Sequence, residues 1–153
     1  MNIIENHPAD GGTVSFVNVR HPFERLISAF LHFQKFVGGY ADKTFEQFIV
    51  QDILEKPVLD AHLRPYNSYC AFCNIKYDIV SKMETFDVDK QRTLDILGLE
   101  NEQKGQRMNI HGGDDIHNIT RDFFKNVSED HLAALVNYYK YDFLMFDYNY
   151  NLQ

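Results

Sequence analysis

Arg20 is the residue best placed to bind a ligand, because it lies between a predicted strand and a predicted helix. The strand delivers it to the carboxyl-terminal edge of a sheet, where ligands bind in open α/β folds. Pro22 begins the helix directly afterwards, and a helix start offers backbone N–H groups and the positive end of its dipole. A guanidinium adds a planar fork of donors that matches phosphate or sulfate oxygens. Ser28 can add a hydroxyl, so Arg20 and Ser28 form a candidate anion site.

A purely structural interpretation of the same residues is equally open. Arg20 and Arg25 would then pair with Glu24 and other carboxylates, and Ser28 would be merely a small helix residue. An arginine at the end of a strand is by itself a weak signal.

Hydrophobic spacing predicts the elements that must position these residues. Residues 13–19 are short and β-branched, which is typical of a buried strand. Residues 22–37 carry apolar side chains at helical spacing and are followed by Gly38 and Gly39, which end the helix. We also expect helices over 44–55, over 87–97 and after an N-cap at Ser128, a strand over 75–83, and irregular segments over 56–74 and 99–116. Helices mixed with short strands indicate an α/β fold.

Aromatic side chains crowd the last part of the chain. Their roughly helical spacing favours packing against the sheet over stacking on sugar rings or bases. They are Tyr138, Tyr139, Tyr141, Phe143, Phe146, Tyr148 and Tyr150.

Length and charge exclude several classes of protein. The chain has 153 residues, which fits one domain, and no window approaches the ~18 consecutive apolar residues of a membrane-spanning helix. We therefore expect no membrane-spanning segment in this chain. Its 15 Lys and Arg against 22 Asp and Glu give a net charge of −7, which argues against a nucleic-acid partner. Any anionic ligand must be held by a local cluster of donors.

Cys70 and Cys73 are the two cysteines, and their spacing leaves several interpretations open. A zinc site would need His62 with His111 or His117, without the usual paired spacing. A redox motif is expected at a helix start after a strand, unlike the surrounding loop. Free buried thiols are a further possibility. His62 could serve as a general base, although a loop histidine that bonds the backbone is the stronger interpretation.

Two tripeptides match the acceptor pattern for N-glycosylation. They begin at Asn118 and Asn126. Such tripeptides are common by chance, so either asparagine is a glycosylation candidate or an ordinary turn residue.

Three longer strings carry a more specific signal. They are VRHPFERLISAF (residues 19–30), HLRPYNSYCAFCNIKYDIVSKMETFDVD (62–89) and TRDFFKNVSEDHLAALVNYYKYDFLMFDY (120–148). In order and spacing they resemble the carbohydrate sulfotransferases, in particular the chondroitin 4-O-sulfotransferase and HNK-1 sulfotransferase type. The first string is similar to the 3′-phosphate-binding motif of that family.

The resemblance implies transfer of a sulfuryl group from 3′-phosphoadenylyl sulfate (PAPS) to a hydroxyl of a glycosaminoglycan, glycoprotein or glycolipid glycan. It implies a P-loop-like, nucleotide-binding fold in which helices flank a parallel sheet. Arg20 and Ser28 would bind the 3′-phosphate of the donor, within a motif at residues 20–28, and no metal is expected. It further implies a location in the Golgi lumen, a membrane anchor in the full-length form, and a disulfide between Cys70 and Cys73.

The sequence departs from the family's pattern before this motif. These enzymes carry a Gly/Ser/Thr-containing loop with a lysine that wraps the 5′-phosphosulfate, whereas none of the 19 residues before Arg20 is a lysine. We therefore expect residues 1–153 to be a single, incomplete sulfotransferase domain that lacks its N-terminal donor-binding loop. The alternative function is a catalytically inactive, truncated remnant that acts as a glycan-binding or interaction module.

Overall fold

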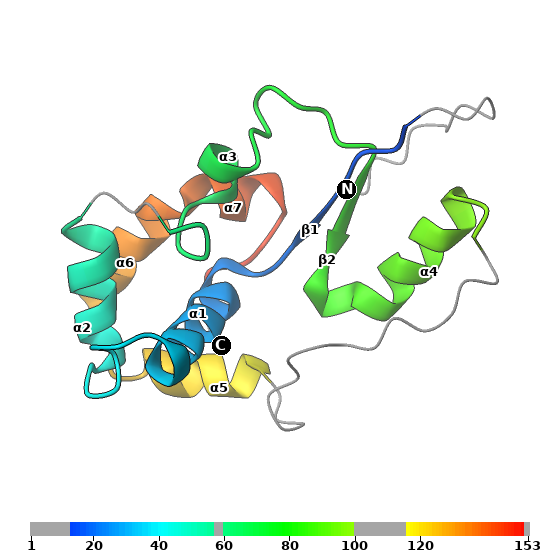
Figure 1. The fold of residues 1–153 in the computed structure, drawn as a ribbon. Helices are drawn as coiled ribbons and strands as arrows, with labels where there is room; N and C mark the ends of the chain where they lie inside the picture. Colours follow the sequence, from blue (N-terminus) through cyan, green and yellow to red (C-terminus); the bar gives the residue numbers. More distant parts are fainter. Residues whose placement is uncertain (1–12, 57–59, 100–115, 152–153) are drawn as a thin grey trace. The chain divides into compact units, whose positions relative to one another are not determined.

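A computed structural model describes residues 13–56, 60–99 and 116–151. The chain forms two compact units (Figure 1). Residues 1–20 and 72–110 belong to the first unit, and residues 21–71 and 111–153 to the second. Each unit has its own architecture, and together they confirm the predicted α/β class.

The first unit holds a two-stranded parallel sheet. Strand β1 (Phe16–Val19) pairs with β2 (Ile79–Lys82), with Phe16 opposite Ile79 and Val19 opposite Lys82. A short 3₁₀ turn, η2 (Met83–Thr85), leads into helix α4 (Phe86–Ile96), which packs on β2. Parallel strands require a long crossover, and here the chain passes through the second unit between them. Both predicted strands form, each shorter than predicted, and the helix over 87–97 is confirmed. The burial predicted for the first strand is wrong, because Phe16 is exposed and only Val19 in β1 is buried.

The second unit is helical. Its longest element is α1 (Pro22–Phe36), which confirms the helix predicted over 22–37. The helix predicted over 44–55 forms as α2 (Phe45–Ile49) followed by a π-helical turn, η1 (Val50–Leu54). The other helices described in this unit are α3 (Tyr66–Tyr69), α5 (Ile116–Phe124), α6 (Glu129–Tyr138) and α7 (Lys140–Met145).

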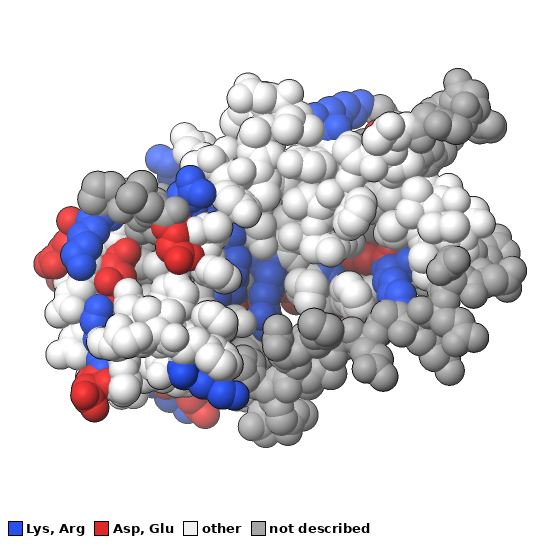
Figure 2. All heavy atoms as spheres, viewed as in Figure 1, with Lys and Arg blue, Asp and Glu red and all other residues white. Residues whose placement is uncertain are grey.

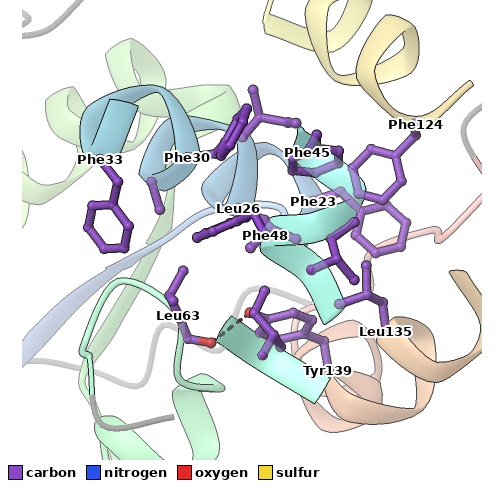
Figure 3. Packing of buried hydrophobic residues seen from close by; sticks show 14 of the residues in the cluster. Phe23, Leu26, Phe30, Phe33, Phe45, Phe48, Leu63, Phe124, Leu135 and Tyr139 are labelled. Atoms are coloured by element: carbon purple, nitrogen blue, oxygen red, sulfur yellow. Dashed lines mark hydrogen bonds between the residues drawn. The ribbon is translucent and has the colours of Figure 1, made fainter. Parts of the chain in front are cut away.

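The helices of the second unit enclose a core rich in phenylalanine (Figure 3). Phe23 lies 4.4 Å from Phe124 and 5.2 Å from Phe143 between ring centroids, so α1, α5 and α7 meet at its ring. Phe30 and Phe48 are 5.1 Å apart and join α1 to α2. Aromatic pairs at these separations add ~0.5–1.5 kcal/mol each beyond the free energy of burial, so the ring contacts stabilise the second unit.

Local sequence signals explain where several of these helices begin and end. Thr44 and Gln47 form a reciprocal capping box at the start of α2. The Ser128 hydroxyl accepts a hydrogen bond from the His131 N–H, as expected of an N-cap for α6. Gly98, with φ of +66°, follows the end of α4.

The structure differs from the sequence-based expectations in three places. The segment predicted to be irregular over 56–74 contains helix α3. Helix α5 was not predicted, although Ile116, Ile119 and Phe123 repeat at helical spacing. The buried aromatic residues of the last segment pack among helices of the second unit, where Tyr139 and Phe143 belong to its core, and not against the sheet. Most of the loop predicted over 99–116 lies outside the described residues.

Candidate functional site

The turn between β1 and α1 forms as the sequence predicts. Strand β1 ends at Val19 and α1 begins at Pro22, so Arg20 and His21 occupy the connection. Arg20 ends the first of the two chain segments that make up the first unit. Ser28 lies in the second turn of α1, in the second unit, and is half-buried. The two candidate residues thus belong to different units, and their joint binding of one anion stays a prediction.

His21 caps the first turn of α1. Its Nδ1 atom accepts a hydrogen bond from the Phe23 N–H at 3.2 Å, and its carbonyl oxygen accepts from the Arg25 N–H at 2.9 Å. Pro22 carries no N–H at all. The helix start therefore offers an anion two backbone donors fewer than an ordinary helix start. The Phe23 N–H is bound to the imidazole, and Pro22 has none.

Arg25 has a structural role. Its Nη2 atom donates to the Arg64 carbonyl oxygen at 2.7 Å and lies 3.5 Å from Asp142 Oδ2, and its guanidinium stacks 4.1 Å from the centre of the Tyr66 ring. The structural interpretation of this arginine is confirmed. It stabilises the core and is not a second anion-binding group.

Asp142 completes this buried ion pair. Both of its carboxylate oxygens accept from the Tyr66 N–H, at 2.8 and 3.1 Å, and the Asn67 backbone also donates to it. The side chain is fully buried, and this burial raises the pKa of Asp142 despite the hydrogen bonds and the nearby Arg25. This role of Asp142 could not be predicted, since nothing in the YKYDF segment marks its aspartate as buried.

Glu24 is a second buried carboxylate, and it lies in the first turn of α1. It is 7% exposed, and its Oε1 atom lies 3.9 Å from Nδ1 of His117 in α5. A negative charge at this position complements the helix dipole. His117 therefore lies beside α1, and no set of three or more metal-ligating side chains occurs within the ranges that the structure describes.

His62 precedes α3 in the second unit, and Cys70 and Cys73 follow that helix. The Nδ1 atom of His62 lies 2.8 Å from Asp60 Oδ1, so its bond is to a carboxylate and not to the backbone as expected. Cys70 and Cys73 are not joined by a disulfide in this structure, and burial raises the pKa of Cys70. Ala71, between them, has a left-handed φ of 51°. The disulfide between Cys70 and Cys73 stays a prediction.

The two glycosylation candidates differ in their surroundings. Asn118 lies within α5, where its side-chain oxygen accepts from Arg121 Nη2 at 2.7 Å, and the hydroxyl-bearing Thr120 is fully buried. Asn126 is exposed in the turn between α5 and α6. Of the two, Asn126 has the geometry that better tolerates an attached glycan.

Charges of both signs are interspersed on the surface. Over α2, basic and acidic side chains lie side by side on the face that Figure 2 shows.

No helix in the described part of the chain is both long and apolar enough to cross a bilayer.

Comparison with known proteins decides what kind of chain this is. The model of a family described as "Sulfotransferase family" matches residues 4–149. The chain belongs to the sulfotransferase family. Carbohydrate sulfotransferase 11 of Mus musculus is 30% identical over 166 residues, which cover 89% of this chain and 47% of the relative. Carbohydrate sulfotransferase 9 of Homo sapiens is 26% identical, with 86% of this chain and 37% of the relative covered.

Carbohydrate sulfotransferase 10 of Danio rerio is 26% identical over 97% of this sulfotransferase chain and 50% of its own length. The chain thus spans about half the length, or less, of the curated relatives it matches. No solved structure matches it significantly. The predicted resemblance to carbohydrate sulfotransferases is confirmed.

Proposed function

We propose that this sulfotransferase transfers a sulfuryl group from PAPS to a hydroxyl of a carbohydrate. The observation that carries the proposal is the similarity to carbohydrate sulfotransferases 11, 9 and 10 over 86–97% of the chain. The strand–turn–helix at residues 16–36 supports it, because the family-like motif lies on this turn.

The proposed reaction is an in-line displacement at sulfur. The bond between sulfur and the 5′-phosphate oxygen of the donor breaks, a bond from sulfur to the sugar oxygen forms, and adenosine 3′,5′-bisphosphate leaves. The hydroxyl proton passes to a base, and no residue is assigned to that role. Such a reaction depends mainly on positioning and on stabilising the charge of the leaving group.

Arg20 and Ser28 are the proposed ligands of the donor's 3′-phosphate. The guanidinium of Arg20 would supply charge-assisted hydrogen bonds, and the hydroxyl of Ser28 a neutral one. Arg25 is excluded from this role, because its guanidinium is held by Asp142 and the Arg64 carbonyl.

A transfer assay tests the proposal. The purified chain is incubated with PAPS labelled in the sulfuryl group and a panel of sulfated and unsulfated glycans, beside the Arg20→Ala variant. Arg92→Ala is the control, since Arg92 is exposed on α4 and pairs only with its neighbour Asp89 in the contacts described. We expect label on one class of glycan, lost in Arg20→Ala and kept in Arg92→Ala. Glycan binding that does not depend on nucleotide, with no transfer, would favour the inactive binding module.

The proposed location is the Golgi lumen, with the full-length protein anchored in the membrane. An oxidising lumen favours the disulfide between Cys70 and Cys73. Passage through the secretory pathway allows glycosylation, which we expect at Asn126 in preference to Asn118. Mass spectrometry of unreduced protein from secretory-pathway expression tests both modifications, and two free thiols with unmodified asparagines would contradict them.

A further inference from the structure

His21 makes two hydrogen bonds that together fix its protonation. The Phe23 N–H donates to Nδ1, so Nδ1 carries no proton. The Nε2 atom lies 2.8 Å from the carbonyl oxygen of Asn149, which can only accept. These two contacts select the tautomer with the proton on Nε2, because a proton on Nδ1 would point an N–H at the Phe23 amide.

The carbonyl that receives this proton belongs to the tail segment, which we define as residues 146–151. The chain turns back at Asp147, whose φ is 52°, and the Tyr148 N–H donates to the Phe143 carbonyl at 3.0 Å. The Asn149 side chain accepts from the Asn151 N–H at 2.9 Å. The tail thus runs from α7 back to the start of α1 (Figure 1) and is shaped by its own hydrogen bonds.

Three aromatic rings contact the imidazole. The ring of His21 lies 5.2 Å from that of Tyr148, 5.6 Å from Phe23 and 5.7 Å from Phe143, each in an edge arrangement. His21 is half-buried. These contacts use residues from α1, α7 and the tail, so the position of His21 depends on all three.

We infer that His21 is a positioning residue of the donor site, and that its hydrogen bond to Asn149 latches the tail onto the turn that carries Arg20. The inference rests on the proposed function. His21 directly follows Arg20 and directly precedes the first residue of α1. Holding His21 in place therefore restricts the backbone at Arg20 and at the start of α1. Without the latch, the nucleotide would have to order this turn when it binds. Ordering the turn costs conformational entropy, and this cost weakens binding.

Two substitutions separate the latch from the helix cap. In His21→Asn, the side-chain oxygen takes the place of Nδ1 and can accept from the Phe23 N–H, but nothing reaches Asn149. In His21→Gln, the amide nitrogen takes the place of Nε2 and can donate to the Asn149 carbonyl. The matched control is His32→Asn, on an exposed face of the same helix.

The experiment is a calorimetric titration of the full chain and these variants with adenosine 3′,5′-bisphosphate, below the thermal midpoint of each variant. We expect His21→Asn to bind about 3–10-fold more weakly, the value of one neutral hydrogen bond. His21→Gln and His32→Asn should bind like the wild type. Wild-type affinity in His21→Asn, or an equal or larger loss in His21→Gln, would overturn the latch.

Two other outcomes are also informative. If no variant and no wild-type protein binds the nucleotide, the proposed function fails, and the donor-site role of His21 fails with it. If His21→Asn does not fold, ¹⁵N NMR of the wild-type imidazole decides. A proton on Nε2 alone near neutral pH supports the latch, and a proton on Nδ1 contradicts it.

Discussion

At the scale of single residues, the arginines of one short motif have different environments. Arg20 directly follows a strand, whereas Arg25 lies one turn into α1 and pairs with the buried Asp142. From sequence, only Arg20 is a candidate anion ligand, and pairing with carboxylates is open for both arginines. Which role Arg25 takes is decided by Asp142, 117 positions away along the chain, so no local pattern could have shown it.

Asp142→Ala should destabilise the protein by about 3–5 kcal/mol. Removing one partner of a buried ion pair leaves Arg25 uncompensated, and the Tyr66 N–H loses its acceptor. Urea unfolding at neutral pH measures the loss. Asp122→Ala is the control, because Asp122 pairs with Lys125 at the surface and its removal should leave the free energy of unfolding nearly unchanged. Similar losses in the two variants would show that the Arg25–Asp142 pair contributes little.

Tyr139→Phe should cost about 1–2 kcal/mol. The buried Tyr139 hydroxyl donates to the Leu63 carbonyl at 2.6 Å, as Figure 3 shows, and its removal leaves that carbonyl without this donor. Burial also raises the pKa of Tyr139. Tyr141→Phe, at a half-exposed ring two residues later, should leave the free energy of unfolding unchanged within about 0.5 kcal/mol. Unfolding in urea compares the two, and equal effects would contradict the role of the hydroxyl.

At the scale of elements, the sequence predicted strands and helices with strong local signals. The strand before Arg20, the helix at Pro22 and the N-cap at Ser128 each follow from residue type and spacing. The π-helical turn at 50–54 and the aromatic contacts of the tail could not be predicted, because they depend on packing between distant segments. The contact of His21 could not be predicted either, since its partner Asn149 lies 128 positions away along the chain.

Glu46 joins two of these elements. Its Oε1 atom accepts from the Ser128 N–H at 3.0 Å and from His131 Nδ1 at 2.8 Å, so α2 is tied to the start of α6. The Ser128 N–H, followed by the contact with His131, lowers the pKa of Glu46. A lowered pKa in the folded state stabilises the protein above the unfolded-state pKa of about 4.3, and this stabilisation is lost as the pH falls through the folded-state value.

Glu46→Gln should therefore reduce stability near neutral pH, and its difference from wild type should shrink on acidification below about pH 4. Urea unfolding at several pH values measures this difference. Glu55→Gln, at an exposed position after η1, serves as the control and should follow the wild-type profile. A difference that stays constant with pH would show that the link between α2 and α6 does not depend on the charge of Glu46.

At the scale of the whole molecule, the family motif crosses from one compact unit into the other. The first unit contributes the strand and Arg20, and the second contributes α1 and Ser28. Membership of the sulfotransferase family is shown by a match over residues 4–149, which includes both units. The expectation of a single domain over residues 1–153 remains a proposal, and so does the activity of the chain on its own.

The most direct test of this account is a calorimetric titration of the folded chain with adenosine 3′,5′-bisphosphate. Arg20→Ala and Ser28→Ala are measured beside their controls, Arg92→Ala and Ser68→Ala, which change an exposed arginine and an exposed serine. We expect the wild type and both controls to bind the nucleotide with the same affinity. Loss of the charge-assisted contact in Arg20→Ala should cost about 1.5–3 kcal/mol, which is about tenfold or more in affinity, and Ser28→Ala should cost somewhat less. A folded wild-type chain that binds no nucleotide, or binds it equally well without Arg20 and Ser28, would contradict the proposed donor site.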